Sequence, residues 1–222
     1  LPLQEDLVTD GFESFVADQY QPNNIHLLVG SRSQFIYAFD YAHLRRKGRM
    51  TEAQKRERAK REQRYIRQRI SISHSFRFIV DEVEQLVKRR AAAHITLFSD
   101  KKQEYRHIIN GSAVLQHLHR RGSFTHVAIS SREARTTTNP LFPVNYVDRQ
   151  LRKDNANQVR ETVQFSRSVN NCLERLAVYQ LYHNFFKPFR VAHRRGRRLR
   201  HGQVAGIKRQ SIDRALEQIF QR

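Results

Sequence analysis

The chain has 222 residues, of which 39% are hydrophobic, and this composition suits one α/β domain with extensions rather than a wholly disordered chain. Lysine and arginine total 41 against 21 acidic residues, which gives a formal net charge of +20. Such an excess favours a polyanionic partner, and nucleic acid is the commonest one. No apolar run approaches the roughly 18 residues of a spanning helix. Residues Leu1–Asp10 lack the basic start of a signal peptide, so we expect no membrane partner.

The single cysteine, Cys172, excludes an internal disulfide framework and a cysteine-based zinc site. We interpret it as a small apolar helix residue in a protein of the reducing cytoplasm. The sequence does not begin with methionine, which suggests that it is a piece of a longer protein.

The first 43 residues predict three successive strands. Residues Glu5–Phe15 begin with apolar side chains and reach Asp10, where we expect the first strand to end or bend. Ile25–Val29 and Phe35–Phe39 are short apolar runs separated by Gly30–Ser33, a pattern typical of a hairpin with its turn at the glycine.

A strongly basic segment follows these strands. Residues Arg45–Arg69 contain twelve lysines or arginines, and good helix formers dominate them. Thr51 is a suitable N-cap, and interspersed glutamates would pair with part of the basic face. The segment therefore predicts an exposed basic helix that projects from the core.

The middle of the chain alternates helices and strands. Ser73–Arg90 carries apolar residues at three- and four-residue spacing, which predicts an amphipathic helix. Ala91–Phe98 is a compact apolar run just before Asp100 and predicts a buried strand. Glu104–Arg121 predicts a further helix, and Phe124–Ile129 another buried strand.

The last third is mainly helical. After a loop over Ser130–Val144, a long helical pattern covers Asn145–Phe186, with Ser166 as the place for a break. A very basic tail over Arg190–Gly206 precedes a short helix over Ser211–Phe220. A strand meander followed by alternating helices and strands predicts an α/β fold with a mixed sheet covered by helices.

Three acids mark the ends of the predicted elements. Asp10 lies at the end of the first strand, Asp100 follows the fourth, and Asp148 lies at the start of the helix after the fifth. Sites in open sheets gather at strand ends, so we expect these carboxylates to converge. Carboxylates suit Mg²⁺, and two such ions roughly 3.5–4 Å apart would activate a water or a 3′-hydroxyl for in-line displacement. Taken singly, an acid at a strand end is more often a cap or turn residue.

Several passages share a pattern with a known family. Thr9–Phe15 holds the first acid, and Leu97–Asp100 is a hydrophobic strand that ends in Ser-Asp. Val147–Arg152 contains an acid-Arg pair followed by Leu-Arg, Phe165–Ser168 reads Phe-Ser-Arg-Ser, and Ala205–Ile207 is an Ala-Gly-hydrophobic stretch. Together these passages resemble the DDE transposases of bacterial insertion sequences, which belong to the ribonuclease-H-like superfamily.

The resemblance spans roughly Asp6 to Ile207 and implies a ribonuclease-H-like mixed five-stranded sheet flanked by helices. It implies that residues 1–189 form a catalytic domain, with residues 44–70 as an inserted basic helical segment. Residues 190–222 would form a basic C-terminal extension with a short helix.

The same resemblance implies a transposase that cleaves DNA and transfers strands by in-line phosphoryl transfer, with two Mg²⁺ or Mn²⁺ ions. Asp10, Asp100 and Asp148 would be its catalytic, metal-binding residues. Its partners would be the transposon ends and the target DNA, and a homodimer would suit the joining of two DNA ends. No helix-turn-helix or zinc ribbon precedes Asp10, so recognition of the transposon ends would need segments outside this sequence.

The third acid departs from the family pattern, in which this residue is usually glutamate. Asp148 is the best-placed candidate, but Glu174 and Glu161 remain alternatives. In a continuous helix, Asp148 and Glu174 would be about 39 Å apart, so the two could serve one site only if the helix breaks. We favour Asp148.

The basic segments are candidate DNA-binding surfaces, because lysine and arginine supply salt-dependent contacts to phosphate. A plain solvated face is the alternative. We interpret the aromatic residues of the long helix as core and the eleven histidines as structural or surface residues, with His183-Asn184 as the polar pair of most interest. The candidate DNA-binding residues are Arg45, Arg46, Lys47, Arg49, Lys55, Arg56, Arg194, Arg195, Arg197 and Arg198.

Two other functions fit the same residues. One is a degenerate transposase-derived domain that binds nucleic acid without cutting it. The other is a related ribonuclease-H-like nuclease, such as a resolvase or a ribonuclease, that uses similar acids on a different substrate.

Overall fold

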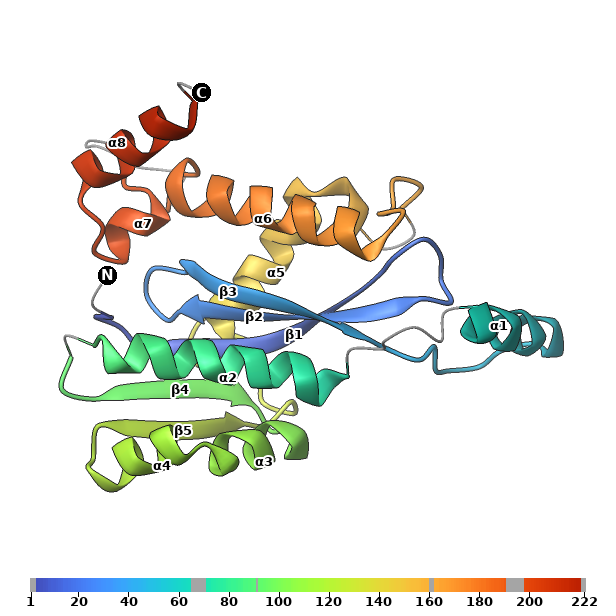
Figure 1. The fold of residues 1–222 in the computed structure, drawn as a ribbon, viewed down its shortest axis with the longest axis horizontal. Coiled ribbons are helices and arrows are strands. Elements are labelled where there is room, and N and C mark those ends of the chain that lie inside the picture. The colour runs from blue at the N-terminus through green and yellow to red at the C-terminus, as the bar shows by residue number, and fades with distance from the viewer. Residues whose placement is uncertain (1–2, 65–70, 91, 160–161, 191–197, 221–222) are drawn as a thin grey trace.

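The computed structural model describes residues 3–64, 71–90, 92–159, 162–190 and 198–220. Their centre is a five-stranded mixed sheet with the strand order β3-β2-β1-β4-β5 (Figure 1). The strands are β1 (Leu7–Phe15), β2 (Pro22–Gly30), β3 (Ile36–His43), β4 (Ile95–Asp100) and β5 (Phe124–Ile129).

The first three strands form the predicted meander, in which β1 pairs antiparallel with β2 and β2 pairs antiparallel with β3. Strands β4 and β5 add to the other edge of β1 in parallel. Four strands therefore point the same way and β2 opposes them. The prediction for the first strand is wrong in one respect: β1 continues through Asp10 to Phe15, because β2 pairs with it along its whole length.

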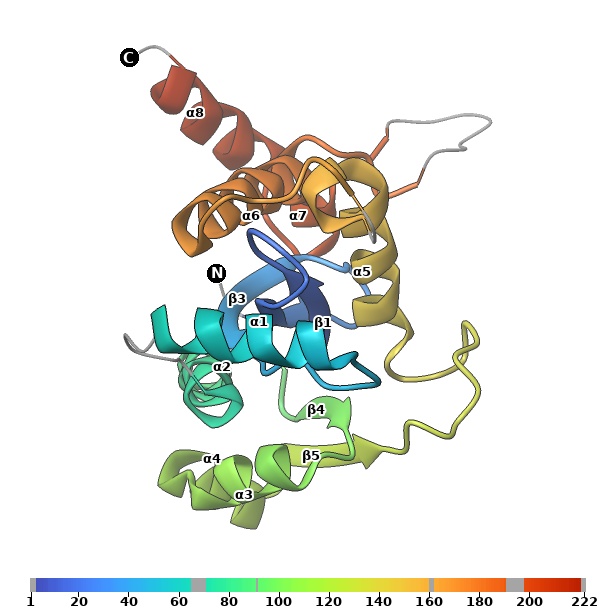
Figure 2. The same cartoon turned by 90° about the vertical axis from the view of Figure 1, so that its right-hand side faces the viewer.

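Helices cover both faces of the sheet, with α2, α3 and α4 on one side and α5 and α6 on the other (Figures 1 and 2). No helix of the described residues has both the length and the apolar character to cross a membrane. The helices are α1 (Glu52–Arg64), α2 (Ile72–Lys88), α3 (Gln103–Gly111), α4 (Ala113–Arg120), α5 (Phe142–Asp154), α6 (Val169–Phe185), α7 (His201–Val204) and α8 (Arg209–Phe220), with a 3₁₀ turn at Ala156–Gln158.

The strand alternation divides the core into two layers. Leu7 and Leu97 pack with the buried face of α2, whereas Val8 and Phe12 pack with Val147 of α5 on the opposite side. Burial of one such side chain stabilises the fold by about 1.5–3 kcal/mol. The two layers hold the sheet rigidly between helices, and β1 contributes side chains to both.

A buried carboxylate organises the turn between β2 and β3. Glu5 accepts hydrogen bonds from the backbone N–H groups of Arg32 and Ser33, both at 2.9 Å, and from the Ser33 hydroxyl. A Cβ at Gly30 would lie 2.2 Å from Glu5 Oε1, so this position needs glycine. The predicted turn at Gly30 is therefore confirmed, with a close approach as its physical reason.

Two predicted helices are each divided in the structure. The helix predicted over Glu104–Arg121 is α3 and α4, because Ser112 is extended and its hydroxyl caps α4. The helical pattern predicted over Asn145–Phe186 is α5 and α6, which residues 155–168 separate. Asn155 is extended and ends α5, and the Ser168 hydroxyl caps the start of α6.

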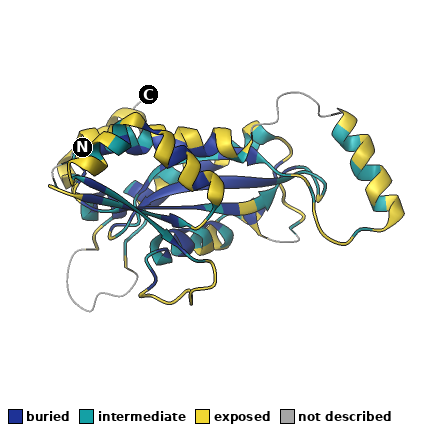
Figure 3. Cartoon of the chain, turned by 90° about the horizontal axis from the view of Figure 1, so that it is seen from below, coloured by how far each residue is buried: buried dark blue, intermediate teal, exposed yellow. Residues whose placement is uncertain are grey.

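The predicted basic helix is present as α1 and projects from the rest of the molecule (Figure 3). Arg61 forms an ion pair with Asp18, and the Arg46 guanidinium lies 4.8 Å from the ring centre of Tyr20. Both partners belong to the connection between β1 and β2. Contacts with this connection therefore hold α1 beside the end of the sheet that also carries the C-terminal end of β4.

Candidate active site

Asp10 and Asp100 lie side by side in the sheet. The parallel pairing of β1 with β4 ends at Thr9 and Ser99, and the two aspartates are the next residue on each strand. Strand alternation places Asp10 on the same face as Val8, which is the face covered by α5. Both carboxylates line one pocket of about 400 Å³.

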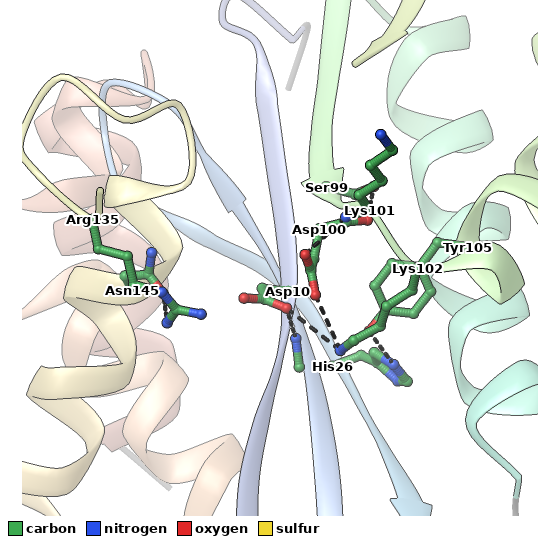
Figure 4. Close-up of polar contacts among 10 residues, drawn as sticks. Asp10, His26, Ser99, Asp100, Lys101, Lys102, Tyr105, Arg135 and Asn145 are labelled. Atoms are coloured by element: carbon green, nitrogen blue, oxygen red, sulfur yellow. Dashed lines mark hydrogen bonds and ion pairs between the residues drawn. The ribbon is translucent and has the colours of Figure 1, made fainter. Parts of the chain in front are cut away.

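One lysine joins the two carboxylates. The Lys102 Nζ atom lies 3.8 Å from Asp10 Oδ1 and 3.8 Å from Asp100 Oδ2, as Figure 4 shows. The backbone N–H of Gly11 donates to Asp10 Oδ1 at 2.7 Å, and that of Lys101 donates to Asp100 Oδ1 at 2.8 Å. The two carboxylates are thus held by backbone donors and share one ammonium group.

Helix α5 brings the third predicted acid to the same pocket. Asp148 lines it together with Asn145 of the same helix. The expected position of Asp148 in the first turn is wrong, because α5 begins at Phe142, with Pro143 in its first turn. Asp148 lies one turn further in, where the helix body rather than a loop fixes its direction.

The carboxylates of the pocket interact electrostatically. Burial and the nearby Asp10 charge together raise the pKa of Asp148 to about 8, although Arg152 and Arg135 lower it. Burial also raises the pKa of Asp10, and the Asp100 charge adds to that effect, whereas Lys102 and the Gly11 N–H lower it. The buried Asp148 Oδ1 atom has no hydrogen-bond partner among the described residues. The pocket therefore holds carboxylates that would be stabilised by an added cation.

Asp10 and Asp100 are better placed than Asp148 to hold a divalent metal ion together. Within the described ranges, no group of three His, Cys, Asp or Glu side chains is arranged to hold a metal ion. Asp10 and Asp100 alone already surround one cationic group, the Lys102 ammonium. One or two carboxylates with water and substrate phosphates are a usual ligand set for Mg²⁺. The donor set therefore fits one ion between Asp10 and Asp100, with Asp148 elsewhere on the pocket wall.

The structure does not bring the alternative third acids to this pocket. Glu174 is exposed on α6 and lines a different pocket, together with Asp154 and Tyr179. Glu161 lies outside the described residues. Asp148 is therefore the described candidate that shares a pocket with Asp10 and Asp100.

Several cations of the pocket were not among the residues predicted from sequence. Arg135 comes from the loop after β5 and donates to Asn145 Oδ1 at 3.0 Å. Arg152 lies over the Phe12 ring at 4.4 Å and donates to the Glu13 carbonyl at 3.0 Å. The spacing of Arg152 from Asp148 by one helical turn is a signal that could have identified it. The basic residues that line the pocket are Lys102, Arg135, Arg149 and Arg152.

A buried polar chain supports Lys102 from behind. Its Nζ atom donates to Tyr105 Oη at 3.2 Å, and Tyr105 Oη contacts His26 Nε2 at 3.0 Å. His26 Nδ1 contacts the Ser75 hydroxyl at 2.8 Å. Burial lowers the pKa of His26 to about 3, so the imidazole is neutral at neutral pH. This chain links the pocket to the core under α2.

Other residues of interest have structural roles. Cys172 is a buried helix residue, as predicted. His183 and His201 stack with ring centres 3.9 Å apart, and Asn184 Oδ1 accepts a hydrogen bond from the Ile36 backbone N–H at 2.9 Å. The polar pair His183-Asn184 therefore attaches α6 to the β2–β3 region rather than to the acidic pocket.

The candidate DNA-binding residues differ in their surroundings. Five of these residues, Arg45, Lys47, Arg49, Lys55 and Arg56, are exposed, and Arg45 and Lys55 also form ion pairs with glutamates of α1. In the tail, Arg198 is exposed. The remaining tail candidates, Arg194, Arg195 and Arg197, lie outside the described residues.

In comparisons with known proteins, no protein-family model matches this sequence, and no curated protein matches it significantly. The functional argument therefore depends on the geometry of the pocket and on the resemblance of the motifs.

Proposed function

We propose that this chain is a transposase catalytic domain of the ribonuclease-H-like class, which cleaves DNA and transfers strands by metal-dependent phosphoryl transfer. The observation that carries the proposal is the pocket to which β1, β4 and α5 contribute Asp10, Asp100 and Asp148. The mixed five-stranded sheet flanked by helices is compatible with the ribonuclease-H-like fold.

In this proposal Asp10 and Asp100 would hold a Mg²⁺ or Mn²⁺ ion, and Asp148 would add a third carboxylate to the wall of the same pocket. A bound divalent ion would supply activation of the attacking oxygen and neutralisation of phosphate charge. The protein contributes two carboxylates on a rigid sheet and a third on a helix that packs against that sheet. The arginines of the pocket orient the phosphate, because planar guanidinium groups bind phosphate oxygens in a defined geometry.

The position of α1 supports a DNA substrate. Four parallel strands point to one end of the sheet. Asp100 is the last residue of β4 at that end, and the segment that leads into α1 leaves the sheet there from the end of β3. Lys47 and Arg49 of this segment and Arg56 of α1 are among the exposed cations there. A duplex whose scissile phosphate enters the pocket would meet these cations along its backbone, and they would add affinity without sequence preference.

The test is cleavage of a DNA duplex in the presence of Mg²⁺. We expect Asp10→Asn and Asp100→Asn each to lower the cleavage rate by about 100-fold or more, because each removes a metal ligand and its charge. Asp81→Asn, on the exposed face of α2, makes the same chemical change outside the pocket and should keep the wild-type rate. Full cleavage by Asp100→Asn would refute the site assignment.

The products distinguish transposition from simple hydrolysis. A labelled DNA end with a free 3′-hydroxyl should appear joined to target DNA if the domain transfers strands. Cleavage without joined products would favour a related nuclease.

A second candidate function is DNA binding without catalysis, as in a degenerate transposase-derived domain. Two observations favour it: Lys102 lies between Asp10 and Asp100, and no three-residue metal group is found in the described part of the chain. DNA binding by a protein that neither cleaves nor binds Mn²⁺ would support this candidate.

A further inference from the structure

The Lys102 side chain occupies the place between two carboxylates where a cation is best stabilised. Its ammonium group is equidistant from Asp10 and Asp100, at 3.8 Å from one oxygen of each. Figure 4 shows the side chain directed toward both aspartates, whereas the neighbouring Lys101 points away from them. The lysine therefore supplies one positive charge where the proposed function requires a divalent ion.

This position of Lys102 is built by the fold. Tyr105 is fully buried, and its hydroxyl accepts a hydrogen bond from the ammonium while its ring lies 4.9 Å below it. The ring stacks on Phe76 of α2, with centroids 3.8 Å apart, and its hydroxyl contacts His26. A surface lysine usually samples many rotamers, but here a rigid aromatic support favours one of them.

We infer that Lys102 is an internal cation that competes with a divalent metal ion for Asp10 and Asp100, so that metal loading requires its ammonium group to leave the space between them. The inference rests on the proposed function, because it assumes that these two carboxylates are metal ligands. The inference adds that Lys102 raises the concentration of metal ion at which the site becomes occupied.

The surroundings of Lys102 allow such a displacement. Its side chain is 38% exposed, and it borders the open volume of about 400 Å³ that Asp10 and Asp100 also line. The unbranched lysine stem can rotate into this volume without movement of the backbone. The displaced ammonium would stay in the pocket, where a substrate phosphate could replace the lost carboxylate contacts.

The test is Mn²⁺ binding to the complete chain without DNA. The electron paramagnetic resonance signal of free Mn²⁺ measures how much of the ion remains unbound. Lys102→Met keeps the aliphatic stem over Tyr105 and removes the charge, and Lys102→Gln is a second uncharged variant. Lys101→Met is the matched control, because it makes the same charge change at an exposed neighbour. Asp100→Asn reports whether Mn²⁺ binds at this site.

We expect both Lys102 variants to bind Mn²⁺ about tenfold more tightly than the wild type, which is the scale of two partly exposed ion pairs. Lys101→Met should stay close to the wild type. A disturbed fold would weaken binding, so tighter binding cannot come from structural damage. If the Lys102 variants bind with unchanged or lower affinity while Asp100→Asn loses binding, the metal site stands and the role of Lys102 is refuted. If none of these proteins binds Mn²⁺, both the inference and the metal-dependent function are refuted.

Discussion

Tyr105 is the residue through which the pocket and the core depend on each other. Burial raises its pKa and lowers that of His26 to about 3, so both side chains are neutral. The Lys102 ammonium can only donate, which leaves the Tyr105 hydroxyl proton to donate to His26 Nε2. His26 must then carry its proton on Nδ1 and donate to Ser75. One direction of donation therefore runs from the pocket to α2.

Replacement of Tyr105 by phenylalanine should lower the stability of the fold. The change leaves His26 Nε2 buried without a partner, which costs about 1–3 kcal/mol of unfolding free energy. The ring stack on Phe76 remains, so the packing is preserved. Denaturant titration measures the difference. Tyr182→Phe, at a tyrosine that is 46% exposed, is the matched control and should change the free energy by less than about 0.5 kcal/mol. Equal effects in the two variants would contradict a structural role for the hydroxyl chain.

At the scale of elements, the strands were predictable because their signals are local. The apolar runs Ile25–Val29 and Phe124–Ile129 lie within observed strands, and β2 ends at Gly30, where the turn to β3 begins. Helix ends were harder to predict, because Ser112 and Ser168 are compatible with a helix interior as well as with a cap. Only the packing of each helix on the sheet decides which of the two roles the serine takes.

The site was predictable in part, for the same reason. Asp10 and Asp100 follow apolar strand residues, and strand direction brings such residues to neighbouring positions. Asp148 was predicted to lie near the other two acids, and it lines the same pocket. Its position within α5 was not predicted, because the sequence pattern did not show where this helix begins. Lys102 and Arg135 reach the pocket through side-chain direction and loop path, which no local sequence pattern encodes.

Helix α1 and the segment that leads into it carry the prediction that belongs to this scale. Conversion of Lys47, Arg49 and Arg56 together to glutamine should weaken DNA binding similarly for all duplex sequences. The slope of log affinity against log salt is negative, and each lost phosphate contact should reduce its magnitude by about 0.9. The triple variant should therefore have a slope whose magnitude is smaller by up to about three. Fluorescence anisotropy over a series of salt concentrations gives this slope.

The control for α1 changes the same charge at the opposite end of the sheet. Lys88, Arg120 and Arg121 are exposed and lie in the helix ends that precede β4 and β5. Their joint replacement by glutamine should leave the slope close to the wild-type value. If the two triple variants lose affinity equally, the net charge of the chain rather than the position of α1 explains the binding.

At the scale of the whole molecule, neutral histidines connect elements that are distant in sequence. His183 contacts the Gln34 carbonyl, and His201 contacts the Ser33 carbonyl, so their stack joins α6 and α7 to the β2–β3 turn. Burial lowers the pKa of His183 to about 3 and that of His201 to about 4. In the unfolded chain both would titrate near 6.5. The fold of the C-terminal part therefore depends on imidazoles that stay uncharged.

The titration of these two histidines should consequently destabilise the metal-free protein in acid. Between pH 6.5 and about 4, these histidines are protonated in the unfolded state but stay neutral in the folded state. The free energy of unfolding that they contribute above pH 6.5 is therefore lost as the pH falls. The loss between pH 7 and 5.5 is about 1 kcal/mol for each buried histidine. Denaturant titrations in EDTA at pH 7.5, 6.5 and 5.5 measure it. The Asp148→Asn variant gives the decisive profile, because it lacks a carboxylate whose raised pKa opposes the histidine effect. A free energy of unfolding that is constant over this range in that variant would contradict the prediction.

Asp148 acts in the opposite direction, which supplies an internal check on this account. Its pKa is raised to about 8 in the fold against 3.8 in the unfolded chain, so the folded state binds the extra proton in the range between. Its contribution to stability therefore increases as the pH falls through 8 and opposes an effect of similar size from the two histidines. Asp148→Asn lacks this titration, so its stability should fall more steeply from pH 7.5 to 5.5 than that of the wild type. Above pH 8 the same variant should be the more stable protein, because it no longer buries a charge beside Asp10. Parallel pH profiles for the two proteins would mean that Asp148 is ionised and solvated in the fold, and the carboxylates of the pocket would then be independent of one another.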